Sequence, residues 1–261
     1  MPFPTANRVL YETNPLDEVV CQIRFPPILR IDAEPPAGFQ EEIRSQYPNY
    51  SQTNAITLPP QVAQFLAQLP LGQMPLAQVS HEFTSLDDVW KISLTRDFVA
   101  LTCKRYDRWE AFRARFSFVL ETMTQHYRPS LFTRIGLRFR NIFCRSKLGL
   151  GETQWSELLN AAVTGICGAH ELGGDVENAQ AVTVLRLPND VGKCGIRSTF
   201  AVQDPNHEQV FMLDSDFFTE QQTEAADAIP KLNAFNSQAD NFFRWCITEA
   251  LHRAMRPRPV D

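Results

Sequence analysis

Alternation of apolar and polar residues predicts a first strand over residues 18–25, which the Pro26–Pro27 pair ends. A short helix is expected over about 36–46, followed by three strands over 78–84, 88–95 and 98–106. An apolar stripe at helical spacing then predicts a long helix over about 109–127, with Asp107 as its N-cap and Pro129 beyond its end. The pattern is weakest over 51–78, where a short helix is one interpretation of 61–69.

The second half of the chain repeats this order. A long strand is predicted over 131–143, a helix over 155–163, and three strands over 179–187, 195–203 and 209–216. A closing helix of about 25 residues follows, because one apolar face continues from Leu232 to Met255. Pro230 is tolerated in its first turn, and Pro257 ends it.

These elements predict an α+β protein built from two β-α-β-β-β-α units, residues 1–129 and 130–261. No residue-by-residue identity relates the halves, so the duplication is architectural, and the two units are expected to form one compact domain. The expected sheet is largely antiparallel and covered on one face by the long helices. Eight continuous strands, or two four-stranded sheets packed edge to edge, both fit the pattern.

The composition is that of an ordinary globular protein. Hydrophobic residues make up 44% of the chain, charged residues 21%, and the formal net charge is −5, which disfavours disorder. Neither a secretory signal pattern nor an apolar run of the roughly 20 residues that a membrane span needs is present. The six cysteines are dispersed, which predicts free thiols and a cytoplasmic, reducing compartment.

Several blocks of sequence carry a family resemblance. They are Asn14-Pro15-Leu16, Glu18-Val19-Val20, Ile23-Arg24-Phe25, Leu131–Asn141, Leu213–Asp216 and the closing amphipathic helix. In this order they resemble a sporadically distributed family of bacterial conserved hypothetical proteins, over nearly the whole chain. That family carries no established activity, so the resemblance transfers no catalytic residue. Its patchy distribution implies mobile or defence-linked gene neighbourhoods, which concerns context and not mechanism. In that context the protein is expected to be an accessory component of a bacterial defence or toxin–antitoxin type system.

Candidate chemistry is sparse. The sequence holds no nucleotide-binding, metalloprotease or serine-hydrolase motif, and no close Cys/His pairs, so no cofactor and no metal are expected. Cys167 and His170 share a glycine-rich loop, where a buried thiol beside an ordinary histidine is favoured over a nucleophilic pair. Asp214 and Asp216 share one face of a strand, and ion pairing with neighbouring arginines is favoured over acid–base or metal chemistry.

The most distinctive feature is a basic stretch, residues 128–147, with six Arg or Lys and no acidic residue. Strand alternation places Arg134, Arg138 and Arg140 on one face, and Arg24 and Arg197 fall on other strands. Residues 204–227, conversely, hold seven acidic residues and no Arg or Lys. Either the acidic strand neutralises the basic one across the sheet, or the arginine face binds an anionic partner.

Three functional hypotheses follow. The leading one is a non-catalytic binding or regulatory protein that docks a protein partner through Arg24, Arg134, Arg138, Arg140 and Arg197. The alternative is nucleic-acid binding on the same arginine-lined face, which the sequence pI of about 5.6 disfavours. The third is an enzyme whose site is assembled from dispersed residues such as Asp214, Asp216 and Arg138. The sequence leaves the oligomeric state open.

Overall fold

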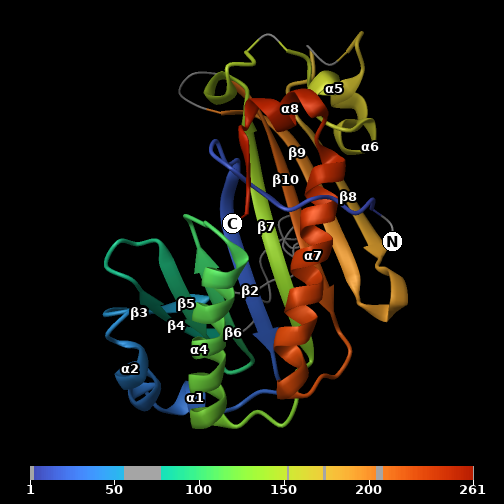
Figure 1. Ribbon diagram of the computed structural model, residues 1–261. Helices are drawn as coiled ribbons and strands as arrows, with labels where there is room; N and C mark the ends of the chain where they lie inside the picture. Colours follow the sequence, from blue (N-terminus) through green and yellow to red (C-terminus); the bar gives the residue numbers. More distant parts are fainter. Residues whose placement is uncertain (1–2, 56–77, 152, 173–174, 204–207, 261) are drawn as a thin grey trace, which may run out of the picture.

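A nine-stranded antiparallel sheet forms the body of the protein (Figure 1). The computed structural model describes residues 3–55, 78–151, 153–172, 175–203 and 208–260. In spatial order the sheet strands are β3 (Asn49–Ala55), β4 (Gln78–Thr84), β5 (Trp90–Leu94), β6 (Phe98–Cys103), β2 (Leu16–Arg24), β7 (Arg134–Cys144), β10 (Glu208–Thr219), β9 (Lys193–Gln203) and β8 (Ala179–Arg186). A separate two-stranded ribbon joins β1 (Val9–Tyr11) to β11 (Pro257–Pro259).

Two long helices and several short ones complete the described part of the fold. The α-helices are α1 (Arg30–Ala33), α2 (Ala37–Ile43), α4 (Trp109–Tyr127), α5 (Trp155–Leu158), α6 (Ala161–Thr164), α7 (Ala228–Cys246) and α8 (Glu249–Ala254). Four single turns of 3₁₀ helix lie at Ser146–Leu148, Gly165–Gly168, Pro188–Asp190 and Ala225–Asp227.

The strand order is the same in the two halves of the sheet. β2 and β7, the opening strands of the two predicted units, pair with each other at its centre. Outward from β2 lie β6, β5, β4 and β3, and outward from β7 lie β10, β9 and β8. The predicted α+β class and the single antiparallel sheet are confirmed. The sheet has nine strands instead of eight because β3, which the sequence pattern missed, pairs along its whole length with β4.

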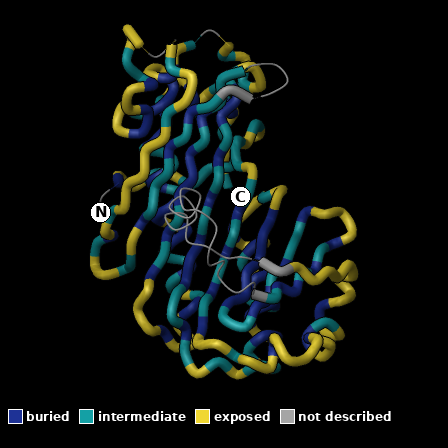
Figure 2. The backbone as a smooth tube through the Cα atoms, turned by 180° about the vertical axis from the view of Figure 1, so that it is seen from behind, coloured by how far each residue is buried: buried dark blue, intermediate teal, exposed yellow. Residues whose placement is uncertain are grey.

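The long helices α4 and α7 lie on the same face of the sheet, one over each half (Figure 1). Phe112, Phe116 and Met123 of α4 are buried, as are Phe235 and Phe242 of α7, because their apolar stripes face the strands. Figure 2 views the sheet from the opposite side, where no described helix crosses the strands. We call this second side the open face.

The helix prediction over 109–127 matches α4, but the residue predicted to cap its N-terminus is wrong. The N-cap is Arg108 without a side-chain cap, and not Asp107. The helix ends at Arg128, which takes a left-handed conformation (φ 48°) while its amide N–H donates to the Thr124 carbonyl. Pro129 then prevents continuation.

The predicted continuous closing helix is wrong, because it is broken between α7 and α8. Ile247 is extended and bridges to Leu159, and the Thr248 hydroxyl caps the first turn of α8 by accepting from the Leu251 amide. The helix predicted over 155–163 is similarly split into α5 and α6, with Leu159 extended between them. The helix considered over 61–69 lies outside the described residues.

Candidate partner-binding surface

The predicted arginine row lies on the open face of β7, at the middle of the sheet. Ile135 and Leu137 are fully buried on the helix side, so Arg134, Arg138 and Arg140 must point the other way. The alternation inferred from the sequence therefore describes this strand correctly.

Each arginine of the row has an acidic partner. Arg138 donates from Nε and Nη2 to the two carboxylate oxygens of Asp214, both at 2.7 Å. Arg134 Nη2 lies 2.6 Å from Oδ2 of Asp216. Both partners stand on β10, which pairs directly with β7, and each contact runs diagonally across the strand pair. These two ion pairs neutralise charge between the basic strand β7 and the acidic strand β10, which is the first of the two alternatives that the sequence left open.

Arg140 turns instead toward β2. Its Nε donates to Oδ2 of Asp17 at 2.9 Å, its Nη2 donates to the same oxygen, and its Nη1 lies 3.5 Å from Glu18. The carboxylate of Asp17 is 42% exposed, so this pair lies in water, whereas Asp214 is only 8% exposed. The Arg138–Asp214 pair is thus the structurally important member of the row.

Glycine at position 136 allows Arg134 to reach its partner. A Cβ atom there would lie 2.4 Å from Nη1 of Arg134, so the guanidinium occupies the space that any other side chain would fill. The guanidinium also stacks over the Phe218 ring, 4.8 Å from its centroid. Arg134 is therefore held by an ion pair and an aromatic face together.

The remaining two predicted residues differ in their surroundings. Arg24 is opposite Arg134 in the β2–β7 pair, and its Nε donates to Gln22 at 3.3 Å. Arg197 on β9 is opposite Asp214, yet it forms no ion pair within the described part of the chain. Its Nε is buried and lacks a hydrogen-bond partner. Arg134, Arg138 and Arg140 have carboxylate partners, whereas the guanidinium group of Arg197 has none among the described residues and is the one best placed to bind an external anion.

The two aspartates proposed as a catalytic pair are held by arginines. Both oxygens of Asp214 accept hydrogen bonds from Arg138, so neither is left free to move a proton. Burial raises the pKa of Asp216 above the ordinary carboxyl value, and the nearby Arg134 partly opposes that shift. This arrangement is that of a structural ion-pair network.

A hollow of about 450 Å³ lies beside this network on the open face. It is lined by Arg138 and Arg197, by Val182 and Val184 of β8, and by Phe218. Gly195 forms part of its lining, and a Cβ atom there would meet only ordinary contacts, the nearest at 3.8 Å. The lining also includes Arg134, Asp214, Asp216 and Glu220, so the hollow combines guanidinium and carboxylate groups with apolar walls.

The two valines were not predicted as site residues. Val182 and Val184 are 59% and 57% exposed, on a strand whose one neighbour among the described strands is β9. Their signal in the sequence is the Ala179–Arg186 segment, which is rich in β-branched residues and carries a single charge. The pairing of Val182 with Arg197 and of Val184 with Gly195 places them on the open face.

The other residues considered for catalysis or metal binding do not form a reactive site in the described part of the chain. Cys167 and His170 do line a common pocket, but burial raises the pKa of the Cys167 thiol, which favours the unreactive protonated form. All six cysteines are free and buried. Among the described residues no cluster of three potential metal ligands occurs. The described helices include none with the length and apolar character needed to cross a membrane.

Comparison of the sequence with protein-family models and with curated proteins finds no match, so the surface is interpreted from its own geometry.

Proposed function

We propose that this protein is a non-catalytic binding protein that docks an extended segment of a protein partner along β8 and the adjoining hollow. The observation that carries the proposal is that the exposed, apolar edge strand β8 lies beside Arg197, which has no ion-pair partner among the described residues. A free strand edge offers unpaired backbone groups to another chain, and natural proteins usually protect such edges with charge or proline. Residues 179–186 contain one charged residue, Arg186, and no proline.

The partner segment is expected to be apolar with at least one carboxylate. Its backbone would extend the sheet beyond β8, which is a common mode of peptide recognition. An apolar side chain would cover Val182 and Val184, and a carboxylate would accept from the guanidinium group of Arg197 in the hollow. Such a mixed surface, with an apolar centre and satisfied polar surroundings, is typical of protein interfaces.

The alternative of nucleic-acid binding receives less support from the same geometry. Arg134, Arg138 and Arg140 already donate to carboxylates, so their charge is largely cancelled on the open face. A surface that binds nucleic acid electrostatically needs an excess of free basic groups. The proposal of a role in a bacterial defence or toxin–antitoxin type system rests on the family resemblance alone.

Affinity purification from the native host tests the proposal with two matched variants. Val184→Lys places a charge in the hollow, whereas Thr183→Lys places the same charge on the same strand but on the opposite face. Both residues are exposed, so neither change should unfold the protein. We expect the proteins that co-purify with wild type to be lost with Val184→Lys and retained with Thr183→Lys.

Equal recovery with the two variants would remove the hollow from consideration. Retention of the purified protein on DNA or RNA at about 50 mM salt, declining as salt is added, would favour the nucleic-acid alternative instead.

A further inference from the structure

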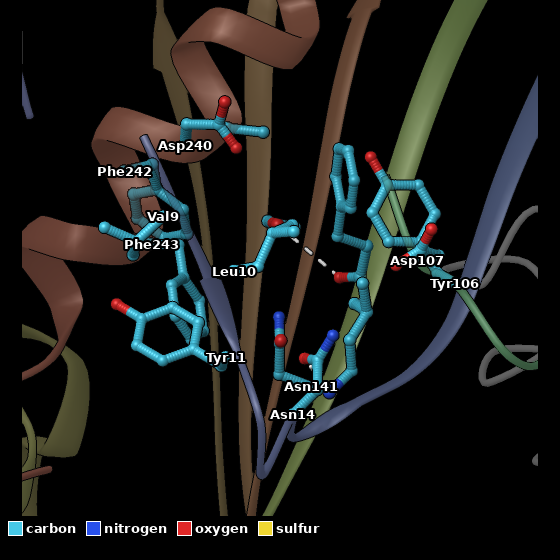
Figure 3. A pocket seen from close by; sticks show the side chains of 14 residues that line it. Val9, Leu10, Tyr11, Asn14, Tyr106, Asp107, Asn141, Asp240, Phe242 and Phe243 are labelled. Atoms are coloured by element: carbon cyan, nitrogen blue, oxygen red, sulfur yellow. Dashed lines mark hydrogen bonds between the residues drawn. The ribbon is translucent and has the colours of Figure 1, made fainter. Parts of the chain in front are cut away.

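A second pocket lies on the helix side of the sheet, remote from the open face. It is enclosed by β1, by α7, by the segment that follows β6, and by β7 and β10 beneath (Figure 3). Its volume is about 100 Å³. An engineered cavity of roughly 150 Å³ holds benzene, so this one is suited to a slender chain of a few atoms.

An asparagine occupies a core position at the floor of this pocket. Along β7 the residues facing the helices are otherwise apolar: Ile135, Leu137, Phe139 and Phe143. Asn141 continues this row and is only 4% exposed. No other described residue hydrogen-bonds to its side-chain amide. Asn141 lines the pocket, so its amide is available to a polar group that enters it, as buried polar side chains normally have a hydrogen-bond partner.

The other buried asparagines have partners. The Oδ1 atom of Asn241 accepts from the Ala6 amide at 2.9 Å. The Nδ2 atom of Asn236 donates to Asp240 at 3.4 Å. Asn141 is thus an exception within its own fold, and its polar group is directed into a pocket.

The charge of the pocket is one-sided. Fourteen residues line it, and they include Asp107 and Asp240 but no Lys, Arg or His. The carboxylate of Asp240 is 41% exposed, and its two contacts, Arg8 at 3.7 Å and Asn236 at 3.4 Å, are both long and both on Oδ2, which leaves Oδ1 free to accept a bond. Figure 3 shows Asp240 and Asn141 at opposite ends, with Leu10 and aromatic rings between them.

We propose that this pocket binds a short aliphatic primary amine that carries a hydroxyl or amide group at its other end. The ammonium group would donate to Asp240 at the mouth, and the methylene chain would lie against Leu10 and Phe242. The terminal polar group would satisfy the amide of Asn141 at the floor. An anionic ligand is disfavoured because it would face two carboxylates with no basic residue lining the pocket.

A set of three probes of equal chain length separates these contributions. They are 4-amino-1-butanol, n-butylamine, which lacks the hydroxyl, and 1-butanol, which lacks the ammonium. Binding is followed at pH 7.5 by the side-chain amide resonances of Asn141 in ¹H–¹⁵N spectra. We expect saturable shifts with 4-amino-1-butanol and affinities at least about tenfold weaker for the other two, the loss of one good hydrogen bond each.

Two substitutions test which residue binds each end of the ligand. Asp240→Asn should reduce the amino alcohol to the affinity of 1-butanol, and Asn141→Leu should remove its advantage over n-butylamine. For the Asn141→Leu protein, binding is read from the resonances of Leu10. Asn141→Leu should also raise the melting temperature, whereas the matched change Asn241→Leu should lower it, because only Asn241 has a partner to lose.

Equal affinity for the three probes would overturn the proposal. So would no shift with 4-amino-1-butanol at about 10 mM, a generous limit even for so small a ligand. The Asp240→Asn result stands on its own if Asn141→Leu does not fold. Because the two surfaces lie on opposite sides of the sheet, either proposal can fail without the other.

Discussion

The ion pair between Arg138 and Asp214 should contribute far more to stability than its neighbour in the same row. Arg138→Met keeps most of the apolar stem but removes the guanidinium, which leaves the 8% exposed carboxylate of Asp214 without its two hydrogen bonds. Arg140→Met is the matched control, since it releases Asp17, which is 42% exposed and can be solvated by water.

The exposure of the two ion pairs determines how much the two substitutions should differ in their effect on the free energy of unfolding. Breaking a fully buried ion pair costs about 3–5 kcal/mol. Arg138 is 38% exposed, and Arg197 stands opposite Asp214 and can partly compensate its charge. We therefore expect Arg138→Met to lower the free energy of unfolding by a smaller amount, about 2–3 kcal/mol. The exposed pair should cost about 0–1 kcal/mol. For a chain of this size, these losses correspond to falls in melting temperature of roughly 4–12 °C and at most roughly 4 °C.

Urea and thermal unfolding followed by circular dichroism measure both variants. The double variant Arg138→Met/Asp214→Leu removes both charges and should recover to within about 1 kcal/mol of wild type. Equal losses for Arg138→Met and Arg140→Met, or no recovery in the double variant, would refute the argument that burial of Asp214 makes this pair important.

Three further predictions concern the fold and the helix-side pocket. Gly192→Ala should cost at least about 2 kcal/mol in urea unfolding, because Gly192 has φ 148° and a Cβ would lie 2.3 Å from the Phe218 carbonyl oxygen, whereas Gly151→Ala, which meets no atom within 4 Å, should be nearly neutral. Phe116→Ala should cost about 3–5 kcal/mol in the same assay, because the ring is fully buried under α4, and a loss below about 1 kcal/mol would contradict this packing. Burial raises the pKa of Asp240 to about 6 despite the opposing charge of Arg8, so the folded protein keeps a proton that the unfolded chain has released above about pH 4. This contribution to stability is therefore present in acid and lost as the pH rises through about 6, and Asp240→Asn should remove that decline; parallel stability–pH curves for the two proteins would contradict it.

The sequence predicted well those elements whose pattern reflects their own burial. α4 matches its predicted range because its apolar residues recur at helical spacing up to a chain break. β3 was missed because Asn49–Ala55 is mostly polar and lacks alternation, and it becomes a strand only by pairing with β4. The break between α7 and α8 was missed because the apolar spacing runs through Ile247, whose conformation depends on a distant bridge to Leu159.

The candidate surface was predictable only in part, because strand alternation fixes the face of a side chain but not its neighbours on other strands. Strand alternation placed Arg134, Arg138 and Arg140 on one face, but the identity of their partners depends on which strands are neighbours. Strand order is a property of the tertiary fold, so the diagonal contacts of Arg134 and Arg138 with β10 could not be read from the sequence. The hollow depends likewise on β9 lying between β8 and β10.

Site-specific photocrosslinking in the native host tests the central claim, docking on the open face beside β8, most directly. A benzophenone amino acid is placed at position 184, which faces the hollow, or at position 183, which faces the other side of the same strand. We predict that irradiation yields a discrete protein adduct from position 184 and none from position 183. Adducts of equal yield from both positions, or none from position 184, would contradict the proposed docking surface.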